Sequence, residues 1–97
     1  MSKPVPKYLK LTDENVTITL TKPAEFNGIK VDTVTLRAPT VRDIRISTQT
    51  GGDDEQRELN LFASLAEVGV KDFDDLPYKD YSRISTGYTF LVQESEL

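Results

Sequence analysis

The sequence contains neither cysteine nor histidine among its 97 residues. Without cysteine, the chain has no disulfides and no thiolate metal ligands. The missing histidine removes the usual general base, the proton switch near neutral pH and the commonest metal ligand. No apolar run approaches the length of a membrane span, and the first residues lack the hydrophobic region of a signal peptide. We therefore expect a cytoplasmic protein without membrane contacts or bound cofactors.

Residues for catalysis are also scarce. The serines have no histidine to activate them, and Gly51-Gly52 is not followed by the Lys-Ser or Lys-Thr pair of a phosphate-binding loop. Asp72, Asp74 and Asp75 crowd one segment, but the glycine and the distal glutamate of a calcium loop are missing. Surface solubility explains these carboxylates better than metal binding. We predict that the protein is not an enzyme.

Charge is distributed unevenly along the chain. Residues 1–50 hold eight Lys/Arg and five Asp/Glu, a net charge of +3, whereas residues 51–97 hold four and eleven, a net charge of −7. The acidic half would repel nucleic acid, and the basic residues of the first half are scattered. We expect no nucleic-acid partner.

The first half of the chain shows the pattern of a β-hairpin. Val16, Ile18 and Leu20 alternate with threonines, which is the period of a strand with one buried face. Asn27-Gly28 follows, and both residues tolerate the positive φ of a two-residue hairpin turn. A second strand is predicted over about residues 29–37.

The second strand carries a change of parity. In an unbroken ladder, the apolar residues of the second strand close to the turn would lie on the same sheet face as the apolar residues of the first strand. Val34 and Leu36 would then lie on the opposite face. One extra residue near Asp32-Thr33 corrects this, because it aligns Val34 with Leu20 and Leu36 with Ile18. We therefore predict a β-bulge in the second strand.

The remainder of the chain has helical periodicity. Thr40 is the predicted N-cap of a first helix, with Asp43 three residues on. Asp53 caps a second helix, which is predicted to end at Gly69. Pro77 lies in the first turn of a third helix, where its missing N–H costs nothing.

Together these signals predict an α+β fold, with an N-terminal antiparallel β-hairpin followed by a small three-helix bundle. Residues 1–13 show no sustained period, so we interpret them as a flexible N-terminal arm. Residues 14–97 then form a single domain, as expected for a chain of this length. Gly87 weakens the last helix by about 1 kcal/mol relative to alanine, which indicates close packing at that point.

Four aromatic residues of the last segment are the candidates for partner binding. They lie within thirteen positions and are Tyr78, Tyr81, Tyr88 and Phe90. Tyrosine is enriched where proteins meet proteins. Two interpretations stay open: the rings cover the central helix, or they form a partly apolar surface for an extended or helical partner.

The order of motifs resembles a known family. The matching segments, from about Val16 to Val92, are Leu20-Thr21-Lys22-Pro23, Gly28, Leu36-Arg37-Ala38-Pro39-Thr40, Asp43, Leu76, Asp80 and Phe90-Leu91. This series is similar to the tail assembly chaperones of Mu-like and other contractile-tailed bacteriophages, the tail protein E family. The Leu-Arg-x-Pro-Thr-x-x-Asp segment is its most specific part.

The resemblance implies a non-enzymatic chaperone in the cytoplasm of the host bacterium. Such proteins bind the phage tape measure protein before the tail tube polymerises around it, and tail tube subunits then displace them. The family pattern carries over to Arg37, Pro39, Thr40, Asp43 and Asp80, for which we expect structural roles. Self-association is left open.

Two other functions are compatible with the same residues. The first alternative is a minor structural or completion protein of the phage tail. The second is a host-directed protein that binds a bacterial target. Peptides of the chain in purified virions would favour the first of these alternatives.

Overall fold

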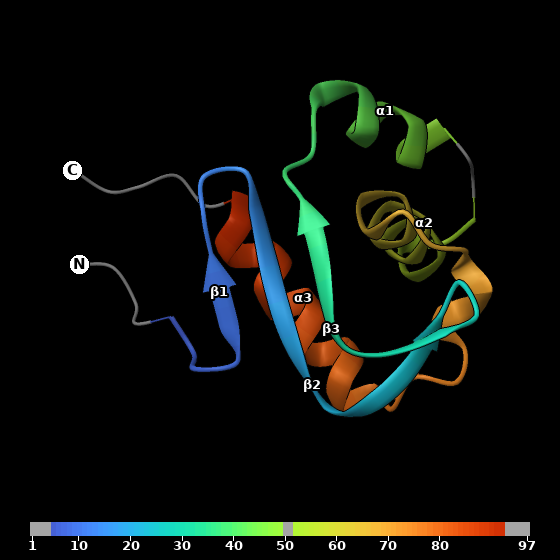
Figure 1. Cartoon of the computed structure of the whole chain (residues 1–97). Helices are drawn as coiled ribbons and strands as arrows, with labels where there is room; N and C mark the ends of the chain where they lie inside the picture. Colours follow the sequence, from blue (N-terminus) through green and yellow to red (C-terminus); the bar gives the residue numbers. More distant parts are fainter. Residues whose placement is uncertain (1–4, 50–51, 93–97) are drawn as a thin grey trace.

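The computed structural model describes residues 5–49 and 52–92. Three strands form an antiparallel sheet in the order β1-β2-β3, and helices pack against one of its faces, α3 across β2 and α2 beside β3 (Figure 1). The elements are β1 (Leu9–Leu11), β2 (Asn15–Phe26), β3 (Ile29–Arg37), α1 (Val41–Gln49), α2 (Asp54–Ala66), the 3₁₀ helix η1 (Val70–Phe73) and α3 (Tyr78–Val92). The predicted α+β fold is confirmed.

The strand β1 lies in the segment that the sequence predicts to be a flexible arm. Leu9 pairs with Ile18 and Leu11 with Val16, and Leu9 is buried against the core. Three residues are too few to show a period, so only their contacts with β2 reveal the strand. The prediction of a flexible arm over residues 1–13 is therefore wrong for Leu9–Leu11.

The predicted hairpin is confirmed. Asn27 and Gly28 have φ values of 57° and 78°, and Phe26 pairs with Ile29 directly beside the turn. Two successive positive φ values match the right-handed twist of the flanking strands. Alternation then places Val16 and Ile18 on the buried face of the sheet.

The ladder between β2 and β3 is irregular, but the extra residues belong to β2. Ala24 pairs with Val31 and Thr19 with Thr33, so residues 20–23 lie opposite Asp32 alone. The bulge predicted near Asp32-Thr33 in the second strand is thus in the wrong strand.

The register of the buried residues differs accordingly. Val34 pairs with Ile18 and Leu36 with Val16, instead of with Leu20 and Ile18. The physical reason lies in the extra segment of β2, where Pro23 has no N–H to donate. The segment therefore leaves the ladder, and the other strand continues without interruption.

The hydrophobic core lies between the sheet and the helices α2 and α3. Its buried side chains are Leu9, Val16, Ile18, Leu20, Phe26, Val34, Leu36, Leu61, Phe62, Ala63, Leu65, Phe73, Leu76 and Ile84. The helix α1 contributes none of them, because Ser47 is its only buried residue within the described part. α1 is therefore held mainly by polar contacts at its start and by packing against α2.

The start of α1 is a reciprocal cap. Thr40 Oγ1 accepts a hydrogen bond from the Asp43 N–H (3.2 Å), and Asp43 Oδ2 accepts one from the Thr40 N–H (2.8 Å). Two backbone donors that the helix leaves unpaired are thereby satisfied. The predicted N-cap is confirmed.

We expect Thr40→Ala to lower the free energy of unfolding by about 1 kcal/mol, because the hydroxyl acceptor at the N-cap is lost. Urea denaturation measures the change. Thr40→Ser keeps the acceptor and is the control, which should stay close to the parent. Equal stability of the alanine and serine variants would show that the cap contributes nothing.

The helix α2 begins as predicted but ends earlier. Asp53 Oδ1 accepts a hydrogen bond from the Gln56 N–H at 2.9 Å. At the other end Glu67 has a φ of 60°, and its N–H donates to Ser64 O. The residue with the left-handed backbone conformation is therefore Glu67 and not Gly69. A hydrogen bond from Asn27 Nδ2 to the Glu67 carbonyl holds this residue in place.

Candidate partner-binding surfaces

The junction between β3 and α1 is a compact polar network. The Arg37 guanidinium donates two hydrogen bonds to the Asp43 carboxylate, from Nη1 (2.7 Å) and Nη2 (3.0 Å). Together with the N–H of Thr40, this pairing holds the pKa of Asp43 well below its ordinary value of 3.8. The hydrogen bond to Asp43 likewise raises the pKa of Arg37. The bidentate pair is charged at neutral pH and fixes the direction in which α1 leaves the sheet.

A second polar anchor joins α3 to the extra segment of β2. Asp80 is fully buried, and its carboxylate accepts hydrogen bonds from the Thr21 N–H (2.7 Å) and the Thr21 hydroxyl (3.0 Å). The Arg83 guanidinium donates to Thr19 O at 2.8 Å and lies 4.3 Å from the centre of the Tyr8 ring. The Asp80 carboxylate therefore takes the place of a β3 carbonyl as the hydrogen-bond acceptor for the Thr21 N–H of β2.

The four aromatic candidates do not form one surface. Tyr81 and Tyr88 contact Phe62 of α2, with ring centroids 5.8 and 5.1 Å apart, and both are half-buried. Phe90 lies about 200° around the helix from Tyr88 and packs against the core. Only Tyr78 is largely exposed, at 79%. Tyr81 and Tyr88 thus cover part of the central helix α2, whereas the Tyr78 ring is left exposed.

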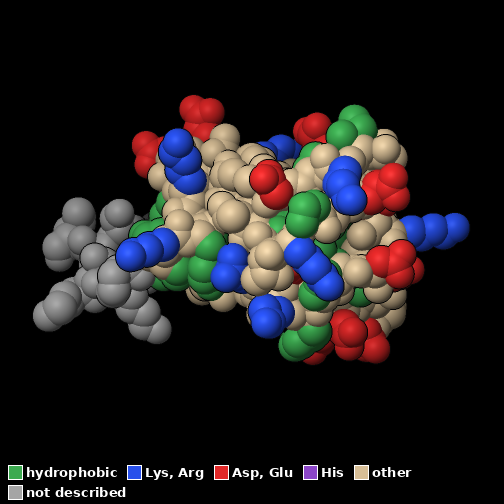
Figure 2. All heavy atoms as spheres, turned by 60° about the horizontal axis from the view of Figure 1, so that its bottom comes forward, with side chains coloured by type: hydrophobic (Ala, Val, Ile, Leu, Met, Phe, Trp, Pro, Cys, Tyr) green, Lys and Arg blue, Asp and Glu red, His purple; other side chains and the backbone are tan. Residues whose placement is uncertain are grey.

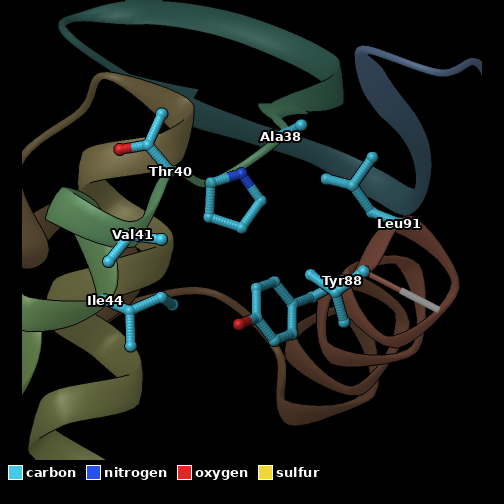
Figure 3. A pocket seen from close by; sticks show the side chains of 8 residues that line it. Ala38, Thr40, Val41, Ile44, Tyr88 and Leu91 are labelled. Carbon is cyan, nitrogen blue, oxygen red and sulfur yellow. The ribbon is translucent and has the colours of Figure 1, made fainter. Parts of the chain in front are cut away.

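One candidate surface is an open groove between α1 and α3. It has a volume of about 380 Å³ and is lined by Ala38, Pro39, Thr40, Val41, Ile44, Tyr88, Leu91 and Val92. Ile44 and Tyr88 point toward one another from opposite walls (Figure 3). We call this the α1–α3 groove. Of the four aromatic candidates, only Tyr88 lines it.

The α1–α3 groove exposes apolar side chains that the core does not use. Val41 is 76% exposed, Val92 46% and Ile44 40%. Burial and the charge of Glu58 raise the pKa of Tyr88, so its hydroxyl stays neutral at the groove wall. The sequence shows Val41 and Ile44 on one helical face, but nothing in it indicates that this face stays open.

A second candidate surface lies where α2 and α3 begin. Tyr78, Tyr81, Asp54, Glu55 and Glu58 line a hollow of about 240 Å³, which we call the tyrosine pocket. The two rings have centroids 6.1 Å apart. The Tyr81 hydroxyl donates to Glu58 Oε1, and burial together with this contact raises the pKa of Tyr81.

Charges of both signs lie on the face shown in Figure 2. Several lysine and arginine side chains lie across the middle of this face, and aspartate and glutamate side chains lie mostly toward its edges. None of the helices in the described ranges has both the length and the apolar character that a membrane crossing requires.

Comparison with protein families matches residues 17–93 to the family described as phage tail assembly chaperone proteins, E, or 41 or 14. The chain belongs to this family. The match extends from β2 through α3 and therefore includes both candidate surfaces. Comparisons with curated proteins and with solved structures found no significant match.

Family membership assigns the chain to the assembly of bacteriophage tails and confirms the resemblance that its motifs indicate. The structure shows what those motif residues do. Arg37, Thr40 and Asp43 form the polar network at the start of α1, and Asp80 anchors β2. Pro39 and Thr40 both lie in the wall of the α1–α3 groove.

Proposed function

We propose that the chain binds apolar helical segments of the phage tape measure protein before the tail tube polymerises, and that it does so in the cytoplasm of the host bacterium. The α1–α3 groove is the observation that supports this proposal. The family membership of the chain supports a partner among phage tail proteins. Binding without catalysis is sufficient for this role.

The shape and lining of the groove suit a helix. Two helices form its sides, and apolar side chains of both remain exposed: Val41 and Ile44 from α1, Val92 from α3. An amphipathic helix of a partner places one apolar stripe in such a groove. A tape measure protein has long stretches of this kind, which would aggregate if left uncovered.

Weak binding by each copy is compatible with this function. The groove is open and contributes only a few apolar contacts, so a single copy dissociates readily. Many copies would still cover one tape measure chain wherever the free protein is more concentrated than the dissociation constant of a single site, because each site then fills independently. Tail tube subunits are then able to displace the copies one by one.

Co-expression in a bacterial host tests the proposal. We expect the tape measure protein of the same phage to be insoluble alone, and to become soluble with several copies of the chain attached. The soluble fraction and the copy number in the purified complex are measured. A tape measure protein that stays insoluble at every expression ratio would contradict the function, and stoichiometric chain in purified virions would favour a structural tail component instead.

Surface variants locate the binding site. Val41→Asp combined with Val92→Ser should reduce the amount of bound chain about tenfold, because a carboxylate is costly to bury against an apolar helix. Ile29→Asp is the control, since Ile29 is also exposed (64%) but belongs to β3 and not to the groove. If Tyr78→Ser weakens binding and the groove variant does not, the tyrosine pocket is the site.

A further inference from the structure

The side of α1 away from the core carries two arginines. Arg42 and Arg45 are exposed and three positions apart, so they are neighbours on the helix surface, on the side opposite the buried Ser47. Within residues 5–49 and 52–92, neither arginine forms a hydrogen bond or an ion pair. We call this surface the outer face of α1; it does not include Val41 and Ile44, which line the α1–α3 groove.

The tyrosine pocket has the complementary chemistry. Tyr78 presents an almost free ring, and Tyr81 forms the floor beside it. Asp54 and Glu55 are exposed at the rim, and Asp54 has only the distant Arg57 (3.4 Å) as a partner. The pocket thus offers aromatic surface and exposed negative charge in one place.

We propose that the outer face of α1 docks into the tyrosine pocket of a second copy of the chain. Arginine pairs with carboxylates through its planar guanidinium and also stacks on tyrosine rings. Charge complementarity between the two surfaces therefore selects another copy of this chain as the occupant.

The contact is head-to-tail. The outer face of α1 and the tyrosine pocket share no residue, so each copy uses one surface toward one neighbour and the other surface toward the next. A heterologous contact of this kind builds open chains unless its rotation closes a ring. The self-association leaves the α1–α3 groove available and stands independently of the proposed tape measure binding.

Two variants that each remove half of the contact test the inference by analytical ultracentrifugation. Arg42→Ala with Arg45→Ala removes the arginines, and Asp54→Asn with Glu55→Gln removes the rim charges. The average mass of the parent should rise with concentration and fall toward 10.9 kDa in about 1 M salt. Each variant alone should associate about tenfold more weakly.

Mixing the two variants gives the decisive result. The arginine variant keeps its pocket and the acidic variant keeps its outer face, so the mixture should form complexes of two chains and nothing larger. Lys10→Ala with Lys30→Ala is the control, because it removes the same charge from exposed strand residues and should leave the association unchanged. Circular dichroism verifies that every variant is folded.

Either of two outcomes would overturn the inference. The parent stays at the mass of one chain at all concentrations and salt levels, or the mixture of variants forms no complex of two chains. Both measurements use the isolated chain, so failure of tape measure binding in co-expression does not affect them.

Discussion

Asp80→Ala is expected to lower the free energy of unfolding by about 3 kcal/mol. The carboxylate is fully buried and accepts hydrogen bonds from both the backbone N–H and the hydroxyl of Thr21. Its removal leaves two donors unpaired and a cavity beside them, in a segment that no neighbouring strand supports. Urea denaturation followed by circular dichroism measures the change.

Two further variants separate this anchor from a general effect of charge. Asp75→Ala removes an exposed carboxylate close by in the sequence and should change the stability by less than about 0.5 kcal/mol. Thr21→Val removes only the hydroxyl contact and should cost about 1 kcal/mol. If Asp80→Ala is no more destabilising than Asp75→Ala, the carboxylate does not hold β2.

Features that depend on neighbouring residues could be predicted from the sequence. The turn at Asn27-Gly28 needs two residues that accept positive φ, and both are adjacent. The cap of α1 joins Thr40 to Asp43, only three positions away. Local sequence is sufficient in these cases because the interacting groups are fixed by the helix or the turn itself.

Features that depend on distant residues could not be predicted. Thr21 and Asp80 are 59 positions apart, and their contact stabilises the extra residues of β2 outside the ladder. The parity of Val34 and Leu36 required an irregular ladder, but it was compatible with a bulge in either strand. The short strand β1 exists only through its pairing with β2.

The candidate surfaces likewise combine features that depend on neighbouring residues with features that depend on distant ones. Periodicity placed Tyr81, Tyr88 and Ile84 along one side of α3, but it could not tell which rings α2 would cover. Phe62 covers Tyr81 and Tyr88 in part, and leaves Tyr78 exposed. The α1–α3 groove depends on the position of α1 at the margin of the core, and a hydrophobic face on a short helix is normally a sign of burial.

The largest effect of a single small change is expected at Gly87, where the sequence indicates close packing and the structure confirms it. A Cβ at this position would lie 2.9 Å from Ile18 Cγ1 and 3.2 Å from Leu9 Cδ2. Ile18 is fully buried and has no room to move. We expect Gly87→Val to lower the free energy of unfolding by about 3 kcal/mol, because it pushes α3 away from β1 and β2.

Gly69→Val is the matched control. Gly69 has a φ of −78°, and a Cβ there would meet nothing within 4 Å, so the same substitution should leave the stability nearly unchanged. Gly87→Ala should fall between the two, since a gain of about 1 kcal/mol in helix propensity offsets part of the clash. Hydrogen exchange adds a local test: Gly87→Val should increase exchange of the β1 amides most, because Leu9 is displaced together with Ile18. Equal stability of the two valine variants would mean that α3 does not pack on the sheet through Gly87.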